Sequence, residues 1–167
     1  GLAQQGLMRA SLEDGGVHDS ELTHAEAHGT GTALGDPIEA GSVSASVVRA
    51  ASIALGSGKA NAGHAEPGAG AAGLLRLTLE LGSARAPPNA QLRALNPHVG
   101  ASLRVASWTL PHQLSAISAG DRMTGGVGSF GYSGTIAHAM VVACLRSAEA
   151  DAATPRLSIG RLCYRRR

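Results

Sequence analysis

The segment at residues 25–40 constrains the fold of this chain more than any other part of the sequence. It reads Ala-Glu-Ala-His-Gly-Thr-Gly-Thr-Ala-Leu-Gly-Asp-Pro-Ile-Glu-Ala. Residues 21–27 are typical of a short strand that delivers His28 at its end, and the glycines that follow stop any regular element. Asp36, Pro37 and Glu39 then supply the N-cap, first-turn proline and capping-box glutamate that are typical of a helix start. We therefore predict a strand, a tight turn and a helix, with one imidazole held rigidly at the end of the strand.

Hydrophobic periodicity divides the rest of the chain into alternating short elements. Gly70 and Gly73 leave one side of a helix bare for close packing, and Leu74, Leu77 and Leu81 form an apolar stripe on it. The order of elements indicates an α/β fold, with a mixed β-sheet layered with α-helices. The pattern predicts helices at 2–12, 36–51 and 67–81, strands at 21–27, 52–58, 102–108, 113–119 and 137–145, a loop at 87–97 and a glycine-rich turn at 125–134.

Length and composition indicate one globular domain or a piece of one. The 167 residues include 23 glycines and only 2% aromatic residues, which suits helices packed closely on a sheet. Two cysteines make no disulfide framework, so we expect a reducing compartment, the cytoplasm. No apolar run approaches the length of a membrane span, so we expect no membrane partner. The first residues resemble neither a signal peptide nor a natural start of a protein.

The charge of the chain is uneven. The net charge is +2, and Arg161, Arg165, Arg166 and Arg167 lie close together at the end of the sequence. We interpret this basic run as a solvated tail. A nucleic-acid-binding tail is the weaker alternative, because no basic stripe interleaved with aromatic residues runs through the rest of the sequence. We therefore predict no nucleic-acid partner.

Three motifs match other kinds of site only in part. His24, Glu26 and His28 lack the H-E-x-x-H order of a zinc protease, and the glycines after His28 break any helix. The H-x-E half of a nucleobase deaminase occurs twice, without the P-C-x-x-C pair that would hold its metal. Residues 68–73 match G-x-G-x-x-G, but they do not directly follow a strand and no acidic residue stands about twenty positions later. We predict no metal site and no dinucleotide site.

Three further motifs occur together and in order. The first is the His28 motif, the second is Gly-Ser-Gly-Lys-Ala-Asn-Ala-Gly-His at residues 56–64, and the third is Gly-Val-Gly-Ser-Phe-Gly-Tyr-Ser-Gly-Thr-Ile-Ala-His at residues 126–138. Together they resemble the signatures of β-ketoacyl synthases (ketosynthases), in the form used by modular polyketide synthases. The resemblance covers residues 1–145 and implies the C-terminal half of a thiolase-like α/β fold. Residues 146–167 would be a poorly ordered tail.

The resemblance implies an acyltransferase that catalyses decarboxylative Claisen condensation of an acyl thioester with a malonyl-type extender. His28 and His64 would be catalytic, donating Nε2–H groups to the developing enolate oxygen, and Lys59 would help to set the electrostatics of the site. Acyl carrier protein would be a partner, carrying acyl groups on its phosphopantetheine, with no other cofactor. The substrate-binding residues that the resemblance implies are Thr30, Thr32, Asn61, Phe130, Gly131 and Tyr132.

Two departures from the family pattern concern activity. Ketosynthases use a cysteine thiolate in a Thr-Ala-Cys-Ser-Ser-like elbow, and neither Cys144 nor Cys163 has that setting, so we expect no nucleophile in this chain. An N-terminal half bearing the cysteine would be a second partner, and the complete enzyme would be a homodimer. The isolated chain would be inactive in condensation and sticky or dimeric. Ile136 also replaces the usual asparagine of the third motif, which removes a buried amide.

A second interpretation is a non-catalytic ketosynthase-like module that binds acyl carrier protein or other parts of a synthase. The two interpretations share a fold. They differ in whether a cysteine elbow lies upstream of Gly1.

Overall fold

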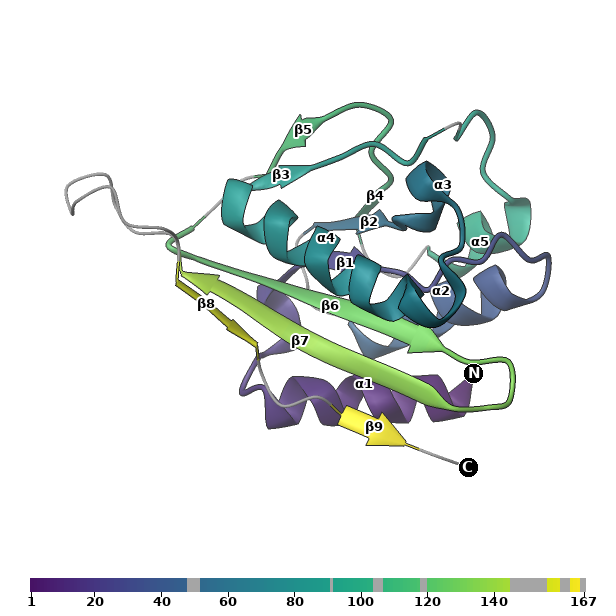
Figure 1. The fold of residues 1–167 in the computed structure, drawn as a ribbon, viewed down its shortest axis with the longest axis horizontal. Helices are drawn as coiled ribbons and strands as arrows, with labels where there is room; N and C mark the ends of the chain where they lie inside the picture. Colours follow the sequence, from purple (N-terminus) through teal and green to yellow (C-terminus); the bar gives the residue numbers. More distant parts are fainter. Residues whose placement is uncertain are drawn as a thin grey trace.

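The chain folds around one mixed β-sheet (Figure 1). The computed structural model describes residues 1–47, 52–90, 92–103, 107–117 and 120–144, together with the strand residues 156–159 and 163–165. The sheet has seven strands in the order β4–β2–β1–β6–β7–β8, and β9 also pairs with β7. These strands are β1 (Leu22–Glu26), β2 (Ile53–Gly56), β4 (Trp108–Thr109), β6 (Arg122–Phe130), β7 (Ile136–Cys144), β8 (Arg156–Ile159) and β9 (Cys163–Arg165).

The sheet is parallel on one side and antiparallel on the other. β4, β2, β1 and β6 run parallel to one another. β7 runs antiparallel to β6 and pairs antiparallel with β8 and β9. The predicted α/β fold with a mixed sheet is therefore confirmed.

Helices cover both faces of this sheet (Figure 1). α1 (Leu2–Asp14) and α2 (Gly35–Ser46) pack together on one face, and α4 (Ala69–Ser83) lies against β1, β6 and β7 on the other. Each face has its own buried apolar cluster. The first includes Met8, Leu12, Val43, Ile53 and Met140, and the second includes Leu77, Leu81, Met123, Val127 and Val141.

α4 packs on the sheet as its sequence predicts. Leu77 and Leu81 are fully buried, and Leu74 packs against the same cluster. A Cβ on Gly73 would lie 3.3 Å from Glu26 Cγ of β1. The small residues therefore let the helix approach the end of the central strand closely.

The glycine-rich stretch at residues 125–134 is mostly a strand, and the predicted turn is wrong there. β6 runs through it, and only its end turns the chain into β7. A Cβ on Gly125 would lie 2.6 Å from Leu77 Cδ1 of α4, and one on Gly126 would lie 2.8 Å from the ring of His138. The glycines make room for neighbouring side chains in a central strand, and local propensity does not reveal that purpose.

The helix after the Gly-Thr-Gly-Thr turn begins earlier than predicted. α2 starts at Gly35, so Leu34 is its N-cap and Asp36 lies inside its first turn. Asp36 Oδ1 instead accepts a hydrogen bond from Gly31 N at 3.1 Å, which ties the helix to the turn before it. Glu39 closes no capping box, because its carboxylate binds backbone amides at the end of β1.

The other predicted elements are confirmed in part. The helices predicted at 2–12 and 67–81 and the strands predicted at 21–27, 52–58 and 137–145 all occur with slightly different ends. α2 ends at Ser46, and residues 48–51 of its predicted course lie outside the described residues. A short α3 (Lys59–Ala62) and a 3₁₀ turn (Glu66–Gly68) were not predicted.

The segment after α4 differs most from its prediction. The loop predicted at 87–97 is followed by a short helix, α5 (Pro97–Ser102). Residue 102, where the sequence predicts the start of a strand, therefore belongs to a helix. Asn96 caps this helix, because its Oδ1 accepts a hydrogen bond from His98 N at 2.9 Å. The strand predicted at 113–119 is reduced to β5 (Ser115–Ala116), which pairs with β3 (Arg85–Ala86). Residues 104–106 and 118–119 lie outside the described residues.

Beyond Cys144 the structure describes β8 and β9, which extend the sheet from β7. The division of the chain into a domain at 1–145 and a tail at 146–167 stays a prediction. Within the described ranges, no helix is long and apolar enough to cross a membrane.

Candidate active site

The parallel strands bring the predicted motifs to one edge of the sheet. β1, β2 and β6 run parallel, so their carboxyl ends lie side by side. His28 follows β1, Lys59 follows β2, and Phe130 is the last residue of β6. α3 and the loop after it carry His64 to the same edge. Segments far apart in sequence thus meet where open α/β sheets bind their ligands.

The two histidines named from the sequence face each other at this edge. The centroids of the His28 and His64 rings are 5.8 Å apart, and the ring planes meet at 88°. The centroid of the Phe130 ring is 5.6 Å from that of His28. His28 is half-buried and His64 is exposed. One imidazole is therefore held within the protein, while the other lies on its open side.

A buried carboxylate holds the backbone at His28. Glu39 accepts hydrogen bonds from His28 N at 2.6 Å and from Gly29 N at 2.9 Å. Gly29 has φ +46°, and a Cβ on it would lie 2.7 Å from Ser57 Oγ, so the turn requires glycine there. Sequence reasoning named Glu39 as a helix cap and missed this role. The capping-box spacing was the only local signal, and it does not identify the partner amides.

The protonation of His64 follows from a local hydrogen bond. Its Nδ1 accepts from Glu66 N at 2.9 Å, so a neutral His64 ring carries its proton on Nε2. Glu66 adopts φ +45°, an uncommon conformation for a residue other than glycine. With this backbone conformation, the chain turns so that the Glu66 N–H points back to the His64 imidazole.

Charge and burial keep His28 neutral. Burial, followed by the positive charge of Lys59 and the nearby His64, lowers the pKa of His28 to about 4. Burial also lowers the pKa of Lys59, while the carboxylates of Glu26 and Glu39 raise it. The site therefore contains a neutral His28 imidazole near the Lys59 amine. The buried carboxylates of Glu26 and Glu39 favour the charged form of that amine.

An open pocket of about 640 Å³ lies beside these residues. Ala27 and Gly29, the chain neighbours of His28, line it, and Lys59 and His64 line it from the second motif. His28 itself is not a lining residue and reaches the pocket edge through its contact with His64. The segment predicted only as a loop supplies much of the remaining wall, and no motif indicated this. Its lining residues are Asn89, Ala90, Leu92, Arg93, Ala94, Leu95 and Asn96.

Asn89 joins that loop to the end of β2. Its Oδ1 accepts a hydrogen bond from Ser57 N at 3.1 Å, and its Nδ2 donates to Leu55 O at 3.1 Å. Asn61, one of the predicted substrate-binding residues, acts in a similar way, because its Oδ1 accepts from Ala90 N at 3.1 Å. Both amides thus fix the pocket wall.

The predicted substrate-binding threonines are placed differently from each other. Thr30 lines the pocket. Thr32 Oγ1 accepts a hydrogen bond from Gly35 N at 3.1 Å, at the start of α2. The first hydroxyl is available to a ligand, whereas the second supports the helix.

The predicted residues of the third motif lie around the β6–β7 connection. Phe130 contacts His28, as described above. Gly131 N donates to Thr135 O at 2.7 Å and closes the turn. Tyr132 is fully exposed. The structure brings Phe130 to the histidines and leaves Tyr132 at the surface.

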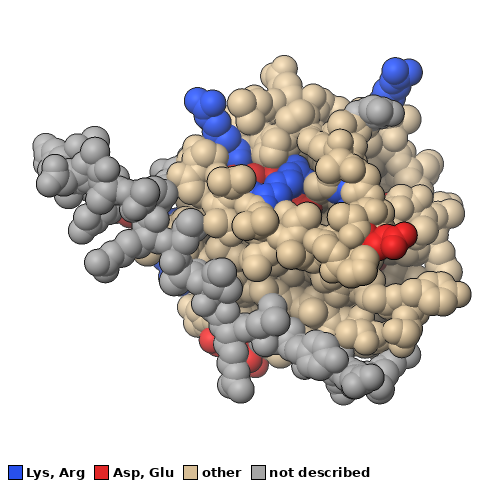
Figure 2. All heavy atoms as spheres, viewed as in Figure 1, with Lys and Arg blue, Asp and Glu red and all other residues tan. Residues whose placement is uncertain are grey.

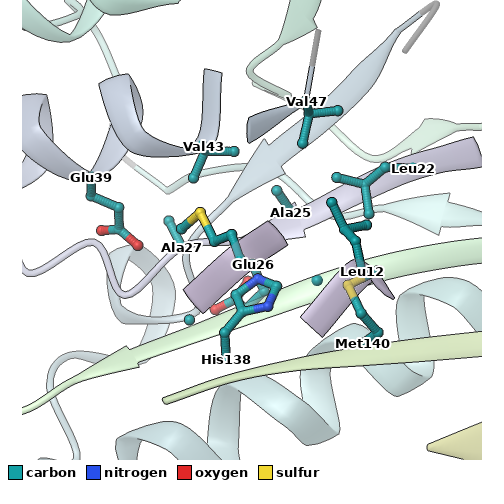
Figure 3. A pocket seen from close by; sticks show the side chains of 13 residues that line it. Leu12, Leu22, Ala25, Glu26, Ala27, Glu39, Val43, Val47, His138 and Met140 are labelled. Carbon is teal, nitrogen blue, oxygen red and sulfur yellow. The ribbon is translucent and has the colours of Figure 1, made fainter. Parts of the chain in front are cut away.

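Two other histidines are buried away from this edge. A cavity of about 20 Å³ lies between α1, α2 and the sheet, and His138 lines it from β7 (Figure 3). His138 Nδ1 lies 2.5 Å from Ser11 Oγ, and burial lowers its pKa to about 4. Burial likewise lowers the pKa of His24 in β1 to about 4. Among the residues that the structure describes, no group of three or more His, Cys, Asp and Glu could hold a metal ion.

Solved structures share this fold. The oxazolomycin ketosynthase domain of Streptomyces albus matches with a TM-score of 0.75 and 31% identity, over 83% of this chain and 25% of that one. The ketosynthase from module 6 of the bacillaene synthase of Bacillus subtilis matches with a TM-score of 0.73 and 31% identity, over 83% of this chain and 26% of that one. The fold is therefore that of the thiolase-like ketosynthase domains, as the sequence predicts.

Sequence comparisons agree with the structural ones. Residues 1–93 match the family model of the β-ketoacyl synthase C-terminal domain. A phenolphthiocerol/phthiocerol polyketide synthase of Mycobacterium tuberculosis is 37% identical over 144 residues, or 83% of this chain. An erythronolide synthase of Saccharopolyspora erythraea is 38% identical over 147 residues, or 84% of this chain. The chain belongs to the β-ketoacyl synthase family, as part of the C-terminal domain of a polyketide-synthase ketosynthase.

The chain spans only a small part of these relatives. It covers 8% of the mycobacterial polyketide synthase and 4% of the erythronolide synthase.

Proposed function

We propose that this chain supplies the oxyanion-stabilising half of a ketosynthase site for decarboxylative Claisen condensation. The observation that carries the proposal is the pairing of His28 and His64, with ring centroids 5.8 Å apart, beside an open pocket. Lys59 supports the pair electrostatically, because its positive charge helps to keep the pKa of His28 low.

The electronic demand of the reaction explains why two imidazole donors would meet at this site. Loss of CO₂ from a malonyl-type thioester leaves an electron pair that forms an enolate, and negative charge develops on the thioester oxygen. Donors already placed at that oxygen lower the barrier. The His64 tautomer presents an Nε2–H, and His28 is neutral near pH 7 because its pKa is lowered to about 4. A neutral imidazole donates a hydrogen bond without acting as a competing strong acid.

The enolate carbon then attacks the carbonyl carbon of an acyl thioester on a cysteine. A C–C bond forms, the C–S bond to the cysteine breaks, and the thiolate leaves. We propose that the extender reaches the pocket on the phosphopantetheine of an acyl carrier protein. The exposed Thr30 hydroxyl and the Asn89 side chain line the pocket and suit such an arm, because its amides need hydrogen-bond partners.

Cys144, the cysteine whose side chain the structure describes, lies far from the two histidines. Cys144 pairs with Arg122, at the opposite end of β6 from Phe130. The distance from Arg122 to Phe130 along β6 is about 26 Å, because each residue step of a strand rises about 3.3 Å. Such a thiol cannot form an acyl-enzyme beside His28, so we propose that an N-terminal ketosynthase half supplies the thiolate.

The outer face of α4 supports this second partner. Leu75 and Leu79 lie one turn apart there and are 65% and 72% exposed. Figure 2 shows that uncharged side chains dominate this face of the molecule. Because the chain matches only about a quarter of each solved ketosynthase, we propose that the missing part of such a domain covers these leucines. The completed domain would form the homodimer that the resemblance implies.

A complete ketosynthase containing this chain tests the proposal. His28→Ala and His64→Ala should each lower the rate of malonyl-thioester decarboxylation about 10²- to 10³-fold, the usual loss on removing one oxyanion donor. His98→Ala is the matched control, because this histidine is exposed on α5. Wild-type decarboxylation in either of these two histidine variants would rule the assignment out. The purified chain alone should show no condensation.

Ile136 favours a second candidate function. It begins β7 opposite Phe130, where ketosynthases usually have asparagine. A non-catalytic module that binds acyl carrier protein would tolerate this change, whereas a full catalyst loses a buried amide. Binding of acyl carrier protein by the complete domain, without decarboxylation, would favour the module. Greater activity in Ile136→Asn would favour the enzyme.

A further inference from the structure

Glu26 joins the two strand ends that carry the site. It is the last residue of β1 and is only 3% exposed. Its Oε1 accepts a hydrogen bond from Gly58 N at 2.6 Å. Gly58 is the N-cap residue of α3, and Lys59 is the first residue of that helix. The buried Glu26 carboxylate therefore fixes the turn that places Lys59. Glu26 also lies only two residues before His28 in the chain.

Arg76 of α4 completes this arrangement from the other side. Its Nη1 donates to the second oxygen of Glu26 at 2.8 Å, and its Nε lies 2.7 Å from Glu80 Oε1, one helical turn away. The guanidinium is 14% exposed. A Cβ on Gly56 would lie 2.9 Å from Arg76 Nη2, and one on Gly58 would lie 3.2 Å from Arg76 Cδ. The glycines of the second motif thus make room for the arginine.

Neither side chain belongs to the pocket itself. The lining of the large pocket includes Lys59 and His64 but neither Glu26 nor Arg76. A planar guanidinium suits such a place, because its fixed donors can bind two carboxylates at once. The two residues therefore do not line the pocket, and they act on it through Lys59 and the segments that they hold.

We propose that Glu26 and Arg76 are positioning residues, which hold the first turn of α3 against the end of β1 through the Gly58 amide and so place Lys59. This inference deepens the proposed function, and it rests on that function for the role of Lys59. It assigns a purpose to the buried ion pair between Glu26 of the His28 motif and Arg76, which lies outside the three motifs.

The same contacts link Arg76 to the charge at Lys59. Burial raises the pKa of Glu26, and Arg76 is the main group that opposes this rise. Without the guanidinium, Glu26 becomes easier to protonate. Glu26 is in turn one of the two carboxylates that raise the pKa of Lys59, so removal of the Glu26 charge itself lowers the pKa of Lys59.

Lys59 is the single lysine of the sequence, which makes a direct test possible. Reductive ¹³C-methylation of the chain gives one lysine NMR signal beside that of the N-terminal amine. In Glu26→Gln, which removes a carboxylate that raises the pKa of Lys59, we expect that pKa to fall. In both Glu26→Gln and Arg76→Met, we expect the Gly58 amide to exchange about tenfold faster, since its hydrogen bond to Glu26 is weakened. Arg76→Lys keeps a cation beside Glu26 and should restore most of the Gly58 protection.

Two controls separate positioning from general stability. Arg85→Met removes an exposed arginine of β3, and Glu80→Gln removes only the other partner of Arg76. Both should leave Lys59 and Gly58 unchanged. A lower melting temperature in Arg76→Met and Glu26→Gln, with unchanged Gly58 exchange in both, means a merely structural ion pair and overturns the proposal. Neither the Lys59 pKa nor Gly58 exchange depends on condensation. A negative result for the positioning role therefore leaves the proposed ketosynthase function standing, and disproof of that function leaves both measurements interpretable.

Discussion

The open edge of the sheet and its closed interior both contain histidines with a low pKa. His24 and His138 lie in the interior, and burial alone lowers the pKa of each to about 4. His28 lies at the edge and reaches about the same value through burial together with Lys59 and His64. A lowered pKa therefore does not identify a functional histidine here. Location at the carboxyl ends of parallel strands, beside a pocket, distinguishes the two groups.

The largest expected difference between the two regions concerns stability. His138→Ala removes a buried side chain and leaves Ser11 Oγ without its imidazole partner, so unfolding free energy should fall by about 2–4 kcal/mol. His64→Ala changes an exposed side chain and should cost only about 0.5 kcal/mol. Urea denaturation of the two variants measures both values. Equal losses would show that the interior and the edge do not differ in this respect.

The second expected effect is a pH dependence that arises from the interior. The unfolded His138 imidazole binds a proton near pH 6.5, whereas the folded one binds it only near pH 4. The unfolded state therefore holds more protons in this window, so the contribution to stability is present above pH 6.5 and is lost as the pH falls towards 4. His138→Gln should flatten the dependence of unfolding free energy on pH between these values.

His98→Gln is the control for this measurement, because its side chain is exposed on α5. Burial raises the pKa of Glu39 and Glu80, which contributes with the opposite sign. That contribution is common to parent and variant, so it cancels in the comparison. An unchanged slope in His138→Gln would contradict the assigned burial effect.

The third prediction sharpens the electrostatic difference between the regions. Lys59→Met removes a positive charge that lowers the pKa of His28, so the pKa of His28 should rise. It should stay below the ordinary 6.5, because burial, the largest cause, remains. The pKa of His138 should not move, since burial is its cause. NMR titration of the imidazole signals tests both, and a shift of His138 equal to that of His28 would remove the distinction.

The smallest expected effect lies within the edge region itself. Thr32→Val removes the hydroxyl that accepts a hydrogen bond from Gly35 N, and loss of such a helix-terminal contact costs about 1 kcal/mol. Thr30→Val changes a hydroxyl that lines the pocket and should leave stability almost unchanged. Thermal unfolding compares them. A greater loss for Thr30 would reverse the roles assigned to the two threonines.

The sequence predicted the parts of the site that follow from strand ends. The sequence pattern before His28 and at residues 52–58 predicted short strands, and β1 and β2 confirm them. That the two strands are parallel is a finding of the structure. The stripe of Leu77 and Leu81 likewise predicted the buried side of α4. The roles of the six implied substrate-binding residues stay predictions.

The sequence did not predict the roles of some residues, because their contact partners are distant in sequence. Glu39 had the spacing of a helix cap, yet it binds the amides of His28 and Gly29 across the turn. Gly125 had the composition of a turn, yet it makes room for Leu77 in a strand. Local propensity describes neither contact, because each depends on how separate elements pack.

By itself, the sequence determined the alternation of strands and helices and the positions of the two histidine motifs, because apolar periodicity and glycine turns act locally. Only the tertiary structure decided what surrounds those motifs. Glu26 meets Gly58 and Arg76 because β1, β2 and α4 pack together, and the two histidines come within 5.8 Å because parallel strands end at one edge. The chemistry of this site therefore depends on contacts that the burial of two apolar clusters enforces.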